Sequence, residues 1–461
     1  MSLADEELVK GAPLTTACSL GYRGVVCRGT ACRPLANGVG QALPLRRVKV
    51  AKDDRRQETA PLAIGIRKVV WTSQAMRECL PMGRIEFVYF DAGGGHRAAA
   101  TALRLVTEQQ LQWDVHLMNL QELLDSIDPV LMLSGLRLQD LYNWLLKMGW
   151  TWGAGGGLRV LQAAIRLYHQ EQVRLLEAYW RKSQPTLVVS LVPHFNRALF
   201  EGLRRVSPVT PFVTVLTDFA DYPPHFWLER QEQFVVCGSE RAVAQARSTG
   251  FRDHQIYATS GMILHPKFYQ EVAVDRAAER QRLGLDPELP TGLVMFGGQG
   301  SSVMVKIARK LEAAKQNLQL ILICGHNERL AAMLRGLRGK VRKYVEGFTT
   351  EVPYYMCLAD FFIGKPGPGS ISEALAMKLP VIVERNARTL PQERYNADWV
   401  LEKQVGLLVR DFGRITPTVE ELLDPSNFAR FRTNAAAINN RAVFEIPGIL
   451  NEILNKPART Q

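Results

Sequence analysis

A turn rich in glycine and proline stands between an apolar run and a helix-like run near residue 364. The apolar run Phe361–Ile363 leads into Gly364–Gly369, and a helix is expected to open at Ser370–Glu373. A glycine turn lets a ligand approach the backbone closely, and the unpaired N–H groups of a helix start attract phosphate. Glu373, one turn inside that helix, is placed to accept hydrogen bonds from a ribose. The pattern indicates a nucleotide-sugar site.

A second glycine loop, Phe296–Ser302, follows the expected strand Leu293–Phe296. Its backbone N–H groups and two hydroxyls could hold a diphosphate. It is not a Walker A loop, because no Gly-Lys-Ser/Thr follows, and the dinucleotide spacing G-x-G-x-x-G is absent. These absences count against an ATPase or a dehydrogenase. The loop alone is a weak signal, and together with Gly367–Glu373 it becomes a strong one.

A third glycine loop, Phe90–Arg97, closes the first expected strand and contains Gly93, Gly94 and Gly95. His96 stands at the start of the helix that follows, where an imidazole can act as a general base near neutral pH. The alternative is that the glycines only make a tight turn and that His96 caps or packs locally. A fourth segment, Val345–Phe348, could offer a nucleobase backbone hydrogen bonds and an apolar wall, or it could be an ordinary strand end.

Apolar runs alternate with helical patterns from residue 83 onward, which favours parallel α/β layering. A segment without period after Met262–Pro266 is expected to be a linker, so we predict two α/β domains in tandem with a ligand cleft at the strand carboxyl ends. The expected strands are 85–90, 115–117, 187–191, 212–216, 233–236, 293–296, 318–323, 343–346, 360–363 and 381–383.

Composition sets further bounds on the 461 residues. The net charge is +12, of which residues 1–80 contribute +6, yet no nucleic-acid-binding signature accompanies it. No apolar run is long enough to suggest a transmembrane helix, and the N-terminus does not resemble a secretory signal. Seven cysteines without metal-ligand spacing favour a reducing compartment. Residues 1–81 show no sustained period, so they are either a disordered basic extension or sequence upstream of a true start at Met82.

The motifs DAGGGHRAAA, GGQGS, GPGSISEALAMKLP and LPQERYN together resemble the monogalactosyldiacylglycerol synthase and processive diacylglycerol glucosyltransferase family. The sequence is more distantly similar to the enzyme that adds N-acetylglucosamine to lipid I of peptidoglycan. The resemblance covers about residues 83–410 and implies an α/β fold of the GT-B type, with two Rossmann-like parallel-sheet domains. It implies an acceptor-binding domain at 82–265, a UDP-sugar domain at 266–425, and C-terminal helices at 426–461 that cross back towards the first domain.

The resemblance also implies roles for individual residues. His96 and Asp218, which follows Thr217, become the candidate catalytic bases, with Gly93–Gly95 as an acceptor loop. The sequence departs from the family at FADYPPHFW, where His225 is displaced, and this bears on the acceptor more than on the donor. The implied donor-binding residues are Gly298, Gln299, Gly300, Ser301, Gly367, Gly369 and Ser370 for the diphosphate, Glu373 for the ribose, and Gln392, Glu393 and Asn396 for the sugar. Phe348, from the segment Val345–Phe348 described above, is added as the expected contact of the base.

Enzymes of this family invert the anomeric centre, so a single displacement is implied. Helix N-termini would stabilise the departing UDP, and no Asp-x-Asp stands in a suitable loop, so we expect neither a metal nor a cofactor. The acceptor is expected to be a diacylglycerol-like lipid. The segment 131–161, with Trp144, Trp150 and Trp152 beside basic residues, would either dock on the inner, cytoplasmic face of a membrane or pack against the first domain.

Two other classes of protein remain open. One is a nucleotide-sugar epimerase on the same fold, which would need further carboxylates beside Asp218 and Asp221. The other is a non-catalytic protein that binds a nucleotide-sugar or a partner, which the intact glycine loops disfavour.

Overall fold

The computed structural model describes residues 84–91, 94–127, 165–314, 317–387 and 389–456. The predictions made for residues 1–81, for Gly93 and for the tryptophan-bearing segment 131–161 therefore lie outside the described residues.

The first half of the described chain contains a six-stranded parallel sheet in the order β2-β1-β3-β4-β5-β6. Most residues of β1, β3, β4 and β5 are buried and apolar, as expected for the inner strands of a parallel sheet that is covered on both faces, whereas the edge strand β6 has no buried residue. The strands are β1 (Ile85–Tyr89), β2 (Val115–Asn119), β3 (Leu187–Ser190), β4 (Phe212–Val215), β5 (Phe234–Cys237) and β6 (Ile256–Ala258).

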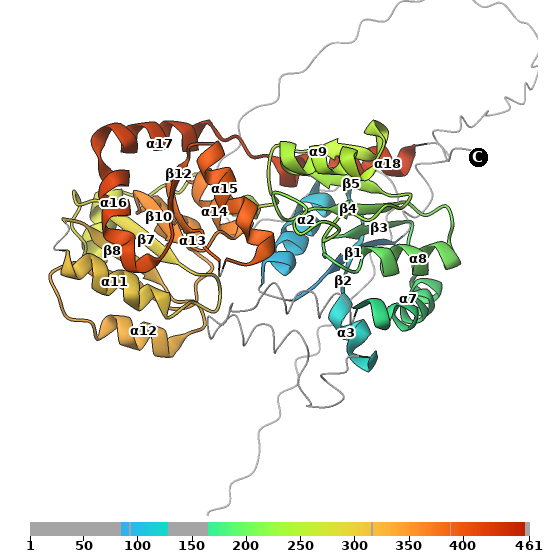
Figure 1. Cartoon of the computed structure of the whole chain (residues 1–461), viewed down its shortest axis with the longest axis horizontal. Coiled ribbons are helices and arrows are strands. Elements are labelled where there is room, and N and C mark those ends of the chain that lie inside the picture. The colour runs from blue at the N-terminus through green and yellow to red at the C-terminus, as the bar shows by residue number, and fades with distance from the viewer. Residues whose placement is uncertain (1–83, 92–93, 128–164, 315–316, 388, 457–461) are drawn as a thin grey trace, which may run out of the picture. The chain divides into compact units, whose positions relative to one another are not determined.

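The second half contains another six-stranded parallel sheet, in the order β12-β11-β10-β7-β8-β9 (Figure 1). Its central strands are again buried, including all five residues of β7. The strands are β7 (Thr291–Met295), β8 (Gln319–Ile323), β9 (Lys343–Glu346), β10 (Phe361–Gly364), β11 (Val381–Glu384) and β12 (Gly406–Val409).

The strand order creates one switch point in each sheet. In the first sheet the chain adds β2 on one side of β1 and then crosses to the other side to form β3. In the second sheet it forms β8 and β9 on one side of β7 and then crosses to the other side to form β10. Ligands of open α/β sheets bind outside the carboxyl ends of such strands. The loops after β1, β7 and β10 are the three glycine loops singled out in the sequence, and the fold places all three at switch points.

Helices alternate with the strands in both halves. Within the described residues no helix is both long and apolar enough to cross a bilayer. The α-helices are α2 (Gly95–Leu111), α3 (Leu120–Leu124), α7 (His169–Ser183), α8 (Asn196–Val206), α9 (Glu240–Thr249), α10 (Arg276–Arg282), α11 (Val303–Ala313), α12 (Glu328–Arg335), α13 (Val352–Cys357), α14 (Pro368–Ala376), α15 (Arg394–Glu402), α16 (Ile415–Leu423), α17 (Pro425–Ala437) and α18 (Ala442–Asn455).

The last two helices pack in different halves. Phe431 of α17 is buried in the core that surrounds α11 and α16, whereas Ile446 and Leu450 of α18 share a core with Leu103 of α2 and with β1 and β3. The chain therefore returns to the first sheet after completing the second one. The domain limits 82–265, 266–425 and 426–461 stay predictions.

The expected strands match the observed ones to within a few residues. Two short strands, β6 and β12, were not expected, and the presumed linker after Pro266 contains the 3₁₀ helix η3 (Pro266–Tyr269) and α10. Helix α14 begins at Pro368, two residues before the expected Ser370, because proline is well suited to the first turn of a helix.

Candidate functional site

His96 lies in the first turn of α2, directly after the loop that follows β1. Gly94 caps this helix with a φ of 79°, a left-handed conformation that glycine adopts without strain. The His96 Nδ1 atom lies 3.1 Å from the Thr217 hydroxyl. Burial lowers the pKa of His96 to about 4, a hydrogen bond with the Leu191 backbone opposes this shift, and the charge of Lys365 adds to it. The imidazole is therefore neutral at physiological pH and able to accept a proton.

Asp218 follows β4 and is 6% exposed. Its Oδ2 atom accepts a hydrogen bond of 3.0 Å from the indole N–H of Trp227, whose ring centroid is 5.7 Å from that of His96. Burial raises the pKa of Asp218 to about 7; the Trp227 hydrogen bond opposes this rise, and the charge of Glu393 adds to it. The carboxyl group of Asp218 thus titrates near neutral pH, and its hydrogen-bond partner Trp227 lies beside His96, the other candidate base.

The loop between β7 and α11 is built from glycines whose geometry is constrained. Gly300 has a φ of 59°, and a Cβ at this position would stand 2.5 Å from the Cys324 carbonyl oxygen. Gly298 and Gln299 are exposed, and no atom lies within 4 Å of a Cβ placed on Gly298. The Ser301 hydroxyl accepts from the Val303 N–H at 3.3 Å. The loop is closed on the side of Gly300 and open on the side of Gly298, as a diphosphate cradle requires.

The loop between β10 and α14 presents a second open helix start. Gly367 is the N-cap of α14, and the Ser370 hydroxyl donates to its carbonyl at 3.2 Å. No atom lies within 4 Å of a Cβ placed on Gly369. Burial raises the pKa of Glu373 to about 7, and the nearby charge of Lys267 opposes this rise. The arrangement agrees with a diphosphate at the helix start and a ribose one turn further in.

The segment predicted to read the donor sugar forms the 3₁₀ helix η4 (Pro391–Glu393) and the start of α15. Glu393 is 8% exposed and its Oε1 accepts from Lys365 Nζ at 3.1 Å, while Gln392 is half-buried. The amide of Asn396 is engaged within the protein: its Oδ1 accepts from the Phe219 N–H at 3.3 Å, its Nδ2 donates to the Pro366 carbonyl at 3.1 Å, and it also hydrogen-bonds with the Asp218 side chain. Contact of Asn396 with the sugar stays a prediction.

Phe348, predicted to contact the nucleobase, is 58% exposed after β9. Its ring stacks on His326 with the centroids 4.0 Å apart and the planes 15° from parallel. The backbone N–H of His326 donates to the Gly298 carbonyl at 2.8 Å, which connects this ring pair to the β7–α11 loop. The sequence analysis did not predict a role for His326. The segment Cys324–Asn327 is another glycine-containing turn between a strand and a helix, and this pattern could have pointed to His326.

Residues from the two halves of the chain meet at this site. Asn396 bonds to the Phe219 backbone, and the Phe219 ring stacks on Trp399 at a centroid distance of 4.4 Å. Asp218 lies within the electrostatic reach of Glu393. Asp218 therefore lies beside the proposed sugar-binding residues of the second half, and His96 lies within the electrostatic reach of Lys365.

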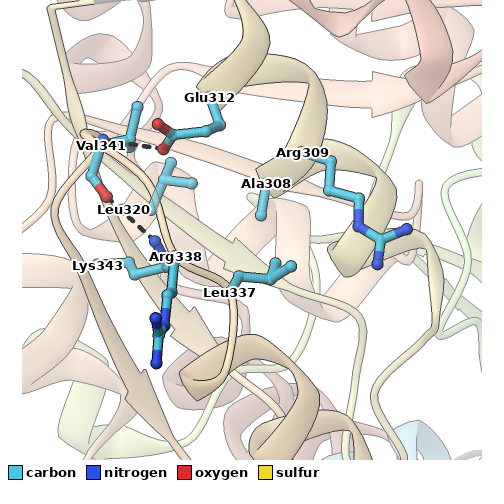
Figure 2. Close-up of a pocket in the computed structure, with 8 residues that line it drawn as sticks. All are labelled: Ala308, Arg309, Glu312, Leu320, Leu337, Arg338, Val341 and Lys343. Carbon is cyan, nitrogen blue, oxygen red and sulfur yellow. Dashed lines mark hydrogen bonds between the residues drawn. The ribbon is translucent and has the colours of Figure 1, made fainter.

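One pocket elsewhere has no relation to these residues. It lies between α11, β8 and the segment leading into β9, and Figure 2 shows Glu312 accepting from the Val341 N–H at 2.9 Å on its rim. Its volume of about 30 Å³ has room for a water molecule but not for a nucleotide. Within the described residues no three His, Cys, Asp or Glu side chains gather into a potential metal site. Metal independence remains a prediction.

Comparison with known proteins identifies the class of this chain. Residues 292–445 match the glycosyltransferase family 28 C-terminal domain. Among solved structures, MurG of Acinetobacter baumannii superposes with a TM-score of 0.54 at 11% identity, over 81% of this chain and 100% of that one. MnaA of S. aureus, solved with UDP, gives a TM-score of 0.52 at 15% identity, over 82% of this chain and 100% of that one. The fold is of the GT-B type, and the chain is a glycosyltransferase.

A more specific relationship comes from the sequence. The chain is 28% identical over 394 residues to the chloroplastic monogalactosyldiacylglycerol synthase of Spinacia oleracea, covering 81% of this chain and 73% of the relative. The chain is also 28% identical over 386 residues to monogalactosyldiacylglycerol synthase 1 of Arabidopsis thaliana, covering 79% of this chain and 70% of the relative. The chain is thus related to the monogalactosyldiacylglycerol synthases, which confirms the resemblance expected from its motifs.

Proposed function

We propose that this protein is an inverting glycosyltransferase that moves a hexose from a UDP-sugar to a diacylglycerol-like lipid. One observation carries the proposal: the candidate bases His96 and Asp218 lie within the electrostatic reach of the ion pair between Lys365 and Glu393. Proton acceptors of the first half thus lie beside the proposed donor-binding residues of the second half. The sequence similarity to the plant synthases supports the lipid acceptor, and the UDP held by MnaA supports the donor nucleotide.

In the proposed reaction, an acceptor hydroxyl oxygen attacks the anomeric carbon while the bond from that carbon to the β-phosphate oxygen breaks. The electron pair leaves with UDP, and the hydroxyl proton passes to a base on the acceptor side. N–H groups at the starts of α11 and α14 stabilise the charge on the departing diphosphate, which is the task that a divalent metal performs elsewhere. We therefore expect chelation with EDTA to leave turnover unchanged.

Two groups can take the proton, and they differ in how turnover depends on pH. If Asp218 is the base, it must be ionised, so kcat/KM falls as the pH drops below about 7. If His96 is the base, its pKa of about 4 keeps it unprotonated, and kcat/KM stays level from pH 8 down to about pH 5. We expect His96→Ala to abolish turnover while UDP affinity is largely retained, and full activity in that variant would remove His96 from the mechanism.

Product analysis tests the proposal. The protein is incubated with UDP-glucose, UDP-galactose or UDP-N-acetylglucosamine, with and without diacylglycerol, and we expect a glycolipid and free UDP only when the lipid is present. Conversion of a UDP-sugar into its epimer without acceptor would show an epimerase instead. Asp221, one of the two carboxylates that this part of the chain offers an epimerase, is engaged by the backbone N–H groups of His225 at 2.9 Å and Trp227 at 2.6 Å.

A lipid acceptor requires access to a bilayer, so we propose that the protein is peripheral on the inner, cytoplasmic face of a membrane. Flotation with liposomes of anionic lipid tests this, and a protein that stays at the bottom of the gradient would favour an acceptor that is soluble.

A further inference from the structure

A lysine that the sequence analysis did not single out lies at the centre of this site. Lys365 directly follows β10, and its side chain is 38% exposed. Its Nζ donates to Glu393 Oε1 at 3.1 Å, and the Glu393 side chain is only 11% exposed. The ion pair thus joins the loop before α14 to the segment predicted to read the donor sugar.

The stem of this lysine crosses the helix start proposed to hold the diphosphate. A Cβ placed on Gly367 would lie 3.4 Å from Lys365 Cε and 3.2 Å from the Ser370 hydroxyl oxygen. Gly369, on the same turn, faces open space. The ammonium therefore stands beside the backbone N–H groups and the hydroxyl of the cradle, where a bound diphosphate would come within its reach.

The same positive charge acts on both candidate bases. It lowers the pKa of His96 and that of Asp218, although for each group burial is the larger influence. Lys365 consequently lies within the electrostatic reach of both candidate bases while it pairs with Glu393.

We propose that Lys365 is a further catalytic residue, whose ammonium exchanges Glu393 for the β-phosphate of the departing UDP. This inference rests on the proposed function. As the bond from the anomeric carbon to the phosphate oxygen breaks, the electron pair goes to that oxygen, and Lys365 stabilises the added charge by hydrogen bonding without giving up a proton. Lysine suits this role because its ammonium is a compact point charge on a flexible stem. Glu393, released from the ion pair, becomes an acceptor for the hydroxyls of the donor sugar.

Titration calorimetry with UDP and with UMP tests the contact, because UMP lacks the β-phosphate. We expect Lys365→Gln to weaken UDP binding about 10- to 100-fold, as for the loss of a charge-assisted hydrogen bond, and to leave UMP binding nearly unchanged. Lys365→Arg, which keeps the charge, should recover part of the lost affinity. In a transfer assay kcat should fall about 100-fold for Lys365→Gln.

Lys403→Gln is the matched control. Lys403 has a similarly exposed side chain, at 39%, and its Nζ pairs with Glu240 of α9 at 3.6 Å. We expect this variant to bind UDP and UMP like the unaltered protein.

Three results would overturn the assignment of Lys365. UDP affinity that is unchanged in Lys365→Gln would exclude contact with the β-phosphate. An equal loss for UDP and UMP would mean that the lysine supports the fold of the loop, as would a loss that Lys365→Arg does not relieve at all. A failure of the unaltered protein to bind UDP would instead contradict the proposed function from which the inference starts.

Discussion

The buried carboxyl group of Asp218 should make the protein less stable as the pH rises, and replacing it should remove that cost. In the folded chain the pKa of Asp218 is about 7, against an ordinary value of 3.8, chiefly because burial disfavours the charged form. Asp218→Asn keeps the size of the side chain and an oxygen that can accept from the Trp227 indole, but it cannot ionise.

The magnitude follows from the two pKa values. Between pH 4 and pH 7 the unfolded chain has released the Asp218 proton while the folded chain still holds it, so unfolding releases a proton and stability falls with rising pH. From pH 5 to pH 7 this loss is about 1.4 kcal/mol per pH unit, or about 3 kcal/mol, and above pH 7 it levels off. The asparagine variant lacks this dependence, so its stability relative to the unaltered protein should increase by about 3 kcal/mol between pH 5 and pH 8.

Urea unfolding of both proteins at pH 5 and pH 8 measures the effect. Comparing the two pH values cancels differences in packing and hydrogen bonding, as well as the titration of Glu373, which both proteins share. A difference between the proteins that stays constant from pH 5 to pH 8 would show that Asp218 is ionised throughout, and the reasoning on its burial would fail. We expect the more stable variant to be catalytically impaired, as is common for buried groups at active sites.

The remaining predictions concern the donor-binding loops. Gly300→Ala should lower the free energy of unfolding by about 2 kcal/mol, because the residue has a positive φ and a new methyl group would meet the Cys324 carbonyl. Gly298 faces open space, so Gly298→Ala should unfold in urea like the unaltered protein but bind UDP more weakly in calorimetry. Equal stability of the two variants would contradict this. Glu373→Gln should weaken binding of UDP about tenfold but not that of 2′,3′-dideoxy-UDP, which lacks the ribose hydroxyls. A loss for both nucleotides would argue against the ribose contact.

The fold and the three glycine loops could be predicted because their signals are local. The loops before His96, at Gly298–Ser301 and at Gly367–Ser370 each join a buried apolar strand to a helix, and in a parallel sheet such turns lie at the same edge. The short strand β12 was missed because Gly406 interrupts its apolar pattern, and the structure explains this glycine by a close approach of its backbone to Val381 of β11.

The parts of the site that could not be predicted depend on contacts between distant segments. Trp227 follows Asp218 by nine residues, but only the folded loop brings its indole N–H to that carboxylate. In the sequence Lys365 cannot be told from a surface lysine, because its partner Glu393 lies 28 residues later in the chain. Asn396 was expected to meet the sugar, and the structure shows its amide hydrogen-bonded to Pro366 and to Phe219, which lies 177 residues earlier in the chain. No local pattern encodes the contact with Phe219.

A crystal structure of the protein with UDP would test the central claim most directly. The account predicts that the diphosphate lies at the starts of α11 and α14, within hydrogen-bonding distance of the Ser301 and Ser370 backbone, with the ribose on Glu373 and the β-phosphate facing His96 and Asp218. UDP bound at any other edge of the second sheet, or with its β-phosphate turned away from those two bases, would contradict it.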